Sequence, residues 1–140
     1  MKEQVARYTV SMNQHLLEKF DKQIDKKGYA NRSEAIRDLI RNSLVEDEWG
    51  KANEKVAATV TLVYNHHTPE LAKRLTDIQH HHNSIIVTTT HVHLDNHNCL
   101  EVIILRGKCK EVKSLSEQLV AVKGIKHGKI TFTTEGKKLW

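Results

Sequence analysis

The sequence predicts an α+β fold in which a short strand and two helices precede a domain of four strands and two helices. Three observations support this prediction. An alternating stretch at residues 7–12 comes first, and two stretches of helical periodicity follow at residues 16–24 and 35–44. The remaining residues give the order strand, helix, strand, strand, helix, strand, which is that of a ferredoxin-like βαββαβ domain.

The composition is typical of a soluble protein. The chain has 140 residues, of which 39% are hydrophobic and 28% charged, and no apolar run reaches the roughly 20 residues that span a bilayer. The start, Met1 to Gln4, lacks the apolar stretch of a signal peptide. We therefore expect a cytoplasmic protein without membrane association, whose cysteines, Cys99 and Cys109, remain thiols.

The first predicted element is a strand at residues 7–12 with two different faces. One face is apolar and the other polar, since side chains alternate along a strand: Tyr8, Val10 and Met12 against Arg7, Thr9 and Ser11. Two helices follow. The first has Leu16, Leu17, Phe20 and Ile24 on one side and ends at Gly28, and the second opens at Asn31, with Glu34 three residues on.

A single strand cannot satisfy its own backbone groups, and about forty residues are marginal for independent stability. The simplest solution is an intertwined dimer in which two copies of the strand pair antiparallel under four helices. This is the ribbon-helix-helix arrangement, which inserts its ribbon into the major groove of DNA. Arg7, Thr9 and Ser11 would then face bases, although an ordinary solvated strand face is the alternative.

The start of the second helix suggests a phosphate contact. Asn31, Arg32 and Ser33 lie where backbone N–H groups favour an anion, although simple capping explains them too. The net charge does not decide whether this part of the chain binds DNA. The net charge is +5, and residues 1–45 hold nine Lys and Arg against six Asp and Glu, but the acidic Glu46–Glu48 cancels this excess of +3.

The second half is organised as a separate domain. Residues 46–54 are predicted to form a linker or a helix tail, and we place the DNA-binding domain at 1–48, a linker at 49–54 and an ACT-like domain at 55–140. Strands are expected at about 56–64, 84–94, 99–106 and 127–134. One helix begins with Thr68 as its cap and Pro69 at its first position, and the other spans about 109–123.

Histidine is unusually abundant here, since nine of the ten histidines lie at or after His66. On a strand, His91 and His93 project to one face, and Cys99 opens the next strand, so a hairpin would bring two imidazoles and a thiol together. The alternative is an exposed polar strand face with one buried cysteine. Glu101 shares the face of Cys99 and is expected to orient a ligand.

His80, His81 and His82 close the preceding helix. Successive helical residues diverge by about 100°, so the three cannot serve one ion, and their spacing does not choose among them. A cationic last turn that complements the helix dipole is the alternative. No Gly-rich phosphate loop, His-Glu-x-x-His motif or paired CxxC is present, so we expect no enzymatic activity.

Five segments carry a family resemblance that runs from about residue 7 to residue 132: Arg7–Ser11, Gly28–Asp38, Gln79–His82, His91–His93 and Cys99–Glu101. The run from Asn31 to Asp38 alone is typical of ribbon-helix-helix proteins in general. In combination with the three His/Cys segments, it makes the chain resemble the nickel-responsive transcriptional regulators. Ser11 stands where that family often has Thr, a change that keeps the hydroxyl.

The resemblance implies a homotetramer in which two ribbon-helix-helix dimers flank four metal-binding domains. It implies one Ni(II) per subunit in a square-planar site formed by His91, His93 and Cys99 of one chain and His80 of a neighbouring chain. This resemblance, and not spacing, selects His80.

The resemblance also has implications for DNA. It implies that Arg7, Thr9 and Ser11 contact bases, and that the nickel-loaded protein binds a palindromic operator and represses nickel-uptake genes. A second, weaker cation site is implied at Glu34 and Asp38.

Three other interpretations fit part of the sequence. The first is a regulator of the same architecture tuned to copper, zinc or cobalt, although a planar d⁸ ion suits these ligands better than tetrahedral Zn²⁺ does. The second, a metal storage or delivery protein, leaves the Arg/Thr/Ser strand unexplained. The third, a ribbon-helix-helix antitoxin with an amino-acid-binding domain, leaves His91, His93 and Cys99 unexplained.

Overall fold

A computed structural model describes residues 3–140, so Met1 and Lys2, at the start of the expected 1–48 domain, lie outside the described residues. The chain divides into two compact units, Met1–Arg41 and Asn42–Trp140. Within residues 3–140, no helix has the length and apolar character needed to cross a membrane.

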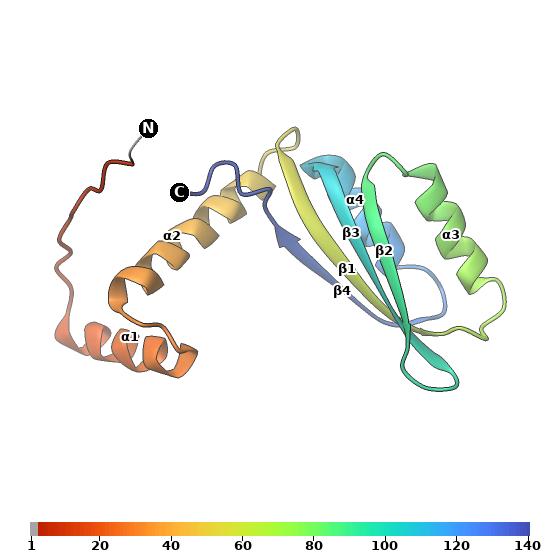
Figure 1. Cartoon of the computed structure of the whole chain (residues 1–140), viewed down its shortest axis with the longest axis horizontal. Helices are drawn as coiled ribbons and strands as arrows, with labels where there is room; N and C mark the ends of the chain where they lie inside the picture. The colour runs from red at the N-terminus through yellow and green to blue at the C-terminus, as the bar shows by residue number, and fades with distance from the viewer. Residues whose placement is uncertain (1–2) are drawn as a thin grey trace. The chain divides into compact units, whose positions relative to one another are not determined.

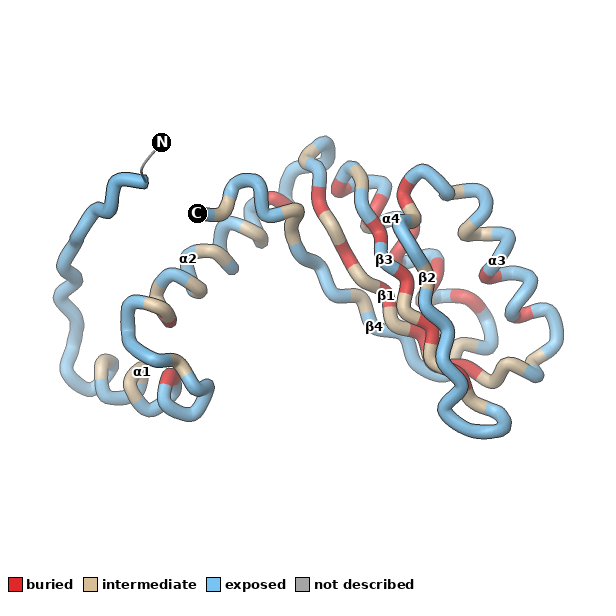
Figure 2. Tube along the Cα trace, in the orientation of Figure 1, coloured by how far each residue is buried: buried red, intermediate tan, exposed pale blue. Residues whose placement is uncertain are grey.

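The segment before the first helix differs from the prediction. Residues 3–13 form neither helix nor strand in the single chain, and Figure 2 shows this segment in the colour of exposed residues. Tyr8, Val10 and Met12, the predicted buried face, are 65%, 56% and 42% exposed. The physical reason is that a lone strand has no partner for its backbone hydrogen bonds.

The predicted end of the first helix and the predicted start of the second are confirmed. Helix α1, Gln14–Lys27, begins after Asn13, whose side chain accepts a hydrogen bond from the N–H of His15, and ends at Gly28, where φ is 77°. Helix α2, Arg32–Trp49, begins after Asn31, whose side chain accepts the Glu34 N–H at 2.9 Å. The Glu34 carboxylate pairs with Arg37, so the capping box is only half formed.

The second unit is a four-stranded antiparallel sheet with two helices on one face. Its elements are β1 (Lys55–Asn65), α3 (Leu71–His81), β2 (Ile86–His93), β3 (Asn98–Lys108), α4 (Cys109–Val120) and β4 (Ile125–Thr133). The strand order is β2-β3-β1-β4, and Figure 1 shows α4 behind the strands. The predicted ferredoxin-like order is therefore confirmed.

Alternation along the two central strands creates the core. Buried residues alternate with partly exposed ones in β1 and in the first half of β3, as the red and tan bands of Figure 2 show. The buried face includes Leu62, Tyr64, Cys99, Glu101 and Ile103. Helices α3 and α4 cover this face with their own buried side chains, Leu71, Leu75, Val112, Leu115 and Leu119.

Helix α3 begins two residues later than predicted. Thr68 does not cap it. The Thr68 N–H instead donates to the Asn65 carbonyl at 3.0 Å as part of a turn. Glu70 has a φ of 67°, a left-handed conformation that interrupts helical geometry, so regular hydrogen bonding begins at Leu71.

The segment between the expected domains is anchored in the second unit. Trp49, the last residue of α2, is buried, its indole N–H donates to the Thr133 carbonyl at 2.8 Å, and its ring lies 4.3 Å from that of Phe132. The N–H of Cys109 also donates to the Glu54 carbonyl at 2.8 Å. Residues 49–54, expected as a linker, are thus fixed against the sheet at both ends.

Candidate metal centre

The β2–β3 hairpin places the three predicted donors on one face of the sheet. In the antiparallel register His93 lies opposite Cys99, and His91 lies opposite Glu101. Directly opposite residues project to the same side, which here is the side covered by the helices. The His91 and His93 rings are exposed, with their centroids 5.4 Å apart.

Cys99, opposite His93 in the hairpin, is fully buried. Its thiol donates a hydrogen bond to the Tyr64 carbonyl, 3.3 Å away. Burial raises the pKa of the Cys99 thiol, and the nearby Glu101 carboxylate adds to this shift. Ligation would therefore require the sulfur to turn from the Tyr64 carbonyl and to lose its proton.

The three donors share a face without forming a closed shell. In residues 3–140 of the single chain, no three His, Cys, Asp or Glu side chains are grouped closely enough to hold a metal ion. The donor chemistry nevertheless fits a late divalent ion, because imidazole and thiolate are ligands for such metals.

The helix-end histidines differ in what their rings contact. His81 Nδ1 donates to the Asp77 carbonyl at 2.7 Å, and His82 Nδ1 donates to the Ile78 carbonyl at 2.9 Å. His80 is exposed at the rim of a pocket of about 360 Å³, and its ring makes no hydrogen bond to any described residue. Of the three imidazoles, that of His80 is the most available for a ligand.

Glu101 holds the end of α3 against the sheet. It is 7% exposed, and its two oxygens accept hydrogen bonds from the Tyr64 hydroxyl at 3.0 Å and the Gln79 amide at 3.3 Å. The Gln79 oxygen in turn accepts a hydrogen bond from Thr89 at 2.9 Å. Burial, with the adjacent Glu101 carboxylate, raises the pKa of Tyr64.

Tyr64, Gln79 and Thr89 were not among the predicted site residues. The sequence contained a signal for each. Thr89 precedes His91 by two residues on the same strand face, Gln79 is adjacent to His80, and Tyr64 is the last inward position of β1.

A further histidine packs beside the candidate site. The His66 ring meets the His93 ring edge-on, with centroids 4.9 Å apart, and its Nδ1 is buried without a partner among the described residues. Burial and the neighbouring histidines lower the pKa of His66, which favours the neutral form of this imidazole. The His66 N–H donates to the His97 carbonyl and joins the turn after β1 to the β2–β3 loop.

The residues expected to contact DNA are exposed in the first unit. Arg7, Thr9 and Ser11 lie in the segment before α1, and Ser33 lies in the first turn of α2. Arg32 forms a two-point ion pair with Asp21, at 2.8 and 2.7 Å, which lowers the pKa of Asp21.

The carboxylates expected at the second cation site already have partners. Asp38 accepts hydrogen bonds from the Tyr29 hydroxyl at 2.8 Å and from Arg41 at 3.2 Å, and Glu34 pairs with Arg37. A cation at this position would have to compete with two guanidinium groups.

The fold and the donor set together are those of a two-domain, metal-responsive regulator. A family model described as the NikR C terminal nickel binding domain matches residues 57–133, and one described as ribbon-helix-helix protein, copG family, matches residues 6–47. The chain therefore belongs to the nickel-responsive regulator family, and it is a regulator and not an enzyme.

Similar proteins agree with this assignment. A "Putative nickel-responsive regulator" of Geotalea uraniireducens is 55% identical over 97% of this chain and 98% of its own length. A protein of the same description from Pyrococcus abyssi is 50% identical over 96% of this chain and 98% of its own length. The uncharacterized protein TM1266 from Thermotoga maritima shares the fold, with a TM-score of 0.50 at 15% identity over 56% of this chain and 98% of that one.

Proposed function

We propose that the chain is a transcriptional regulator that binds a palindromic operator when Ni(II) is bound and represses genes for nickel uptake. The observation that carries this proposal is the register of the β2–β3 hairpin, which places His91, His93 and Cys99 on one face. Membership of the nickel-responsive family supports the choice of ion.

The proposed shell holds one Ni(II) per subunit and is shared between chains. His91, His93 and Cys99 come from one chain, and His80 comes from a neighbouring chain. The free ring of His80 and the carbonyl-bound rings of His81 and His82 support this choice. When bound, the ion ties one subunit to the next.

Glu101 is proposed to orient a ligand and not to bind the ion. Both of its oxygens are occupied by Tyr64 and Gln79. Through Gln79 it fixes the last turn of α3, where His80 lies. Partners of this kind usually contribute to metal affinity through ligand orientation.

DNA binding is assigned to residues 1–48, with a linker at 49–54 and the metal-binding domain at 55–140. Pairing of two N-terminal segments would bury the exposed Tyr8, Val10 and Met12 and present Arg7, Thr9 and Ser11 to bases. Asn31, Arg32 and Ser33 would meet phosphate. The Asp21–Arg32 pair is exposed and therefore weak enough to be exchanged for a phosphate contact.

The proposed assembly is a cytoplasmic homotetramer. It contains two dimers, each formed by the pairing of two N-terminal segments. A shell shared between chains would narrow the range of orientations open to the dimers and so favour simultaneous binding to both halves of an operator. By linkage, DNA would raise nickel affinity by the same factor. Glu34 and Asp38 are proposed to hold a second, weaker cation, in competition with Arg37 and Arg41.

Metal-dependent DNA binding tests the proposal. Duplexes selected from a random pool are titrated with the full chain in the presence of different divalent ions, and fluorescence anisotropy is measured. We expect nickel to increase the affinity for DNA more than the other ions do, and we expect Cys99→Ala to abolish this increase. Arg7→Ala should abolish sequence-specific DNA binding while leaving nickel binding unchanged. Cys109→Ala, at the other buried cysteine, is the matched control. A normal nickel response in Cys99→Ala would contradict the assigned site.

A further inference from the structure

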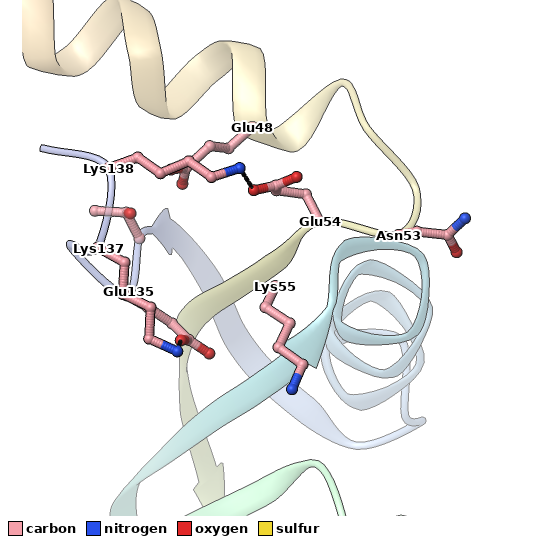
Figure 3. Close-up of a pocket in the computed structure, with 8 residues that line it drawn as sticks. Glu48, Asn53, Glu54, Lys55, Glu135, Lys137 and Lys138 are labelled. Atoms are coloured by element: carbon pink, nitrogen blue, oxygen red, sulfur yellow. Dashed lines mark hydrogen bonds and ion pairs between the residues drawn. The ribbon is translucent and has the colours of Figure 1, made fainter.

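A second pocket in the Asn42–Trp140 unit lies away from the metal donors. It has a volume of about 270 Å³ and is bordered by the end of α2, the start of β1 and the residues that follow β4. Its lining is highly charged, with three carboxylates and three ammonium groups: Glu48, Glu54, Glu135, Lys55, Lys137 and Lys138 (Figure 3).

Two of the three carboxylates are neutralised within the chain. Glu54 forms an ion pair with Lys138, drawn as a dashed line in Figure 3. Glu135 accepts hydrogen bonds from Arg106 at 2.9 Å and Lys137 at 2.8 Å. These two carboxylates therefore have their charges satisfied without a ligand.

Glu48 is the carboxylate that remains. It is 7% exposed, and its Oε2 is buried with no hydrogen-bond partner in the described part of the chain. Burying an unpaired carboxylate oxygen is costly, so such atoms in folded proteins usually have a donor. Because Glu48 also lines the pocket, a molecule bound there could supply the missing donor.

The position of Glu48 in α2 favours a cation as that donor. Glu48 lies in the last turn of the helix, where the dipole favours positive charge and disfavours a carboxylate. That turn holds Glu46, Asp47 and Glu48 and no basic residue. Lys51 pairs with Asp47 at 2.7 Å and acts on Glu48 only through its charge, and no cation within residues 3–140 forms an ion pair with Glu48.

The pocket also contains a cation, Lys55, whose charge no described residue compensates. Lys55 is exposed, and its ammonium group makes no ion pair with any described residue. A simple cation at Glu48 would be repelled by the unpaired Lys55, and a simple anion would be repelled by Glu48. A ligand that carries both charges avoids both repulsions.

We propose that this pocket binds a small zwitterion, with a primary ammonium group on Glu48 and a carboxylate toward Lys55. The volume lies near the lower limit for ligand sites, so the ligand is of the size of a short amino acid. The pocket is open and polar, so binding is expected to be weak, with a Kd on the order of 1 mM. This site is independent of the proposed nickel site, because none of the four proposed ligands lines it.

The test uses the full chain labelled with 5-fluorotryptophan. The two tryptophans give two fluorine signals, and Trp49, next to Glu48, is the reporter. Glycine, β-alanine and γ-aminobutyrate are titrated, with methylammonium and acetate as single-charge controls. We expect a saturable shift of the Trp49 signal with at least one zwitterion, and at least about tenfold weaker binding of either control.

Two variants locate the binding. Glu48→Gln and Lys55→Gln should each weaken the zwitterion about tenfold or more, since each removes one charge-assisted contact. Glu117→Gln, an exposed carboxylate on α4, is the matched control and should bind normally. If Glu48→Gln does not fold, Lys55→Gln alone tests where the zwitterion binds, because Lys55 is exposed and its replacement should leave the fold intact.

Three results would overturn the proposal. The first is the absence of a saturable shift with every zwitterion up to roughly 50 mM, a concentration far above the expected Kd. The second is binding of methylammonium that is as tight as binding of the zwitterions. The third is unchanged zwitterion affinity in Glu48→Gln and Lys55→Gln. None of them bears on nickel binding.

Discussion

The side-chain amide of Gln79 donates a hydrogen bond to the buried carboxylate of Glu101, 3.3 Å away. The contact joins α3, which ends with the histidines, to β3, which begins next to Cys99. If His80 serves a neighbouring chain and His91 serves its own, this hydrogen bond links two metal centres through a single subunit.

Gln79→Ala should therefore weaken nickel binding. The variant removes the hydrogen bonds to both Glu101 and Thr89, and loss of a group that orients a ligand typically costs about 10–100-fold in metal affinity. We expect a loss in this range when nickel is titrated in competition with a chelator. Thr89→Val, which removes only the hydroxyl, should have a smaller effect in the same direction.

Gln118→Ala on the exposed side of α4 is the control for the loss of a glutamine side chain. It should bind nickel like the unaltered chain. Equal nickel affinity in Gln79→Ala and Gln118→Ala would show that the hydrogen bond to Glu101 does not position the ligand.

Glu135 should make stability depend on pH in the acid range. Hydrogen bonds from Lys137 and Arg106 lower the pKa of Glu135 to about 2, from an ordinary value of 4.5. A carboxyl whose pKa is lower in the folded state stabilises the fold above its unfolded pKa, and this contribution is lost as pH falls toward the folded pKa. Glu135→Gln should accordingly lower Tm at pH 7, and the difference from the unaltered chain should shrink between about pH 4.5 and 2.

The control for this comparison is Glu117→Gln, whose exposed carboxyl makes no ion pair with the described residues. Its Tm should follow that of the unaltered chain at every pH. A Tm difference for Glu135→Gln that stays constant from pH 7 to about pH 2 would exclude the ion pairs as its cause.

Gly128 is expected to tolerate no side chain. A Cβ placed there would lie 2.9 Å from Cβ and Cγ1 of Val120, which is closer than non-bonded carbon atoms approach. Overpacking of this kind costs about 1–3 kcal/mol, so Gly128→Ala should lower the free energy of unfolding by that amount in urea at fixed protein concentration. Gly107→Ala has its nearest contact at an ordinary 3.6 Å and should stay within about 1 kcal/mol of the unaltered chain. If Gly128→Ala lowered the free energy of unfolding no more than Gly107→Ala does, helix α4 would have to move away from β4 to make room for the methyl group.

Much of the second unit could be predicted from sequence, because alternation along a strand is a direct consequence of burial on one face. The inward series of β1 ends at Tyr64, and the predicted pairing of His93 with Cys99 agrees with the register. The start of α3 could not be predicted, because the left-handed conformation of Glu70 has no signal in the residue type. The fixed position of Trp49 depends on contacts with Thr133, far away in the chain.

The N-terminal strand and the proposed metal shell are the two features for which the sequence and a single chain give different information. The alternation at Tyr8, Val10 and Met12 predicts a strand whose partner is a second copy, so these side chains are exposed when the chain is alone. Cys99 was expected to face the histidines. Its register does so, but its thiol donates to the Tyr64 carbonyl, since a buried S–H takes an acceptor within reach.

Nickel binding by mixed assemblies tests most directly whether His80 and Cys99 reach the same ion from different chains. The His80→Ala chain and the Cys99→Ala chain are first loaded with nickel separately. Equal amounts of the two chains are then unfolded together, reassembled and loaded with nickel. Bound nickel and thiolate-to-nickel absorption are measured after gel filtration in each case. Each variant alone should lack the intact site. Random reassembly should restore it at about one quarter of the positions, those in which a His80→Ala chain supplies Cys99 and a Cys99→Ala chain supplies His80. A mixture that binds no more nickel than the separate variants would contradict a site shared between chains.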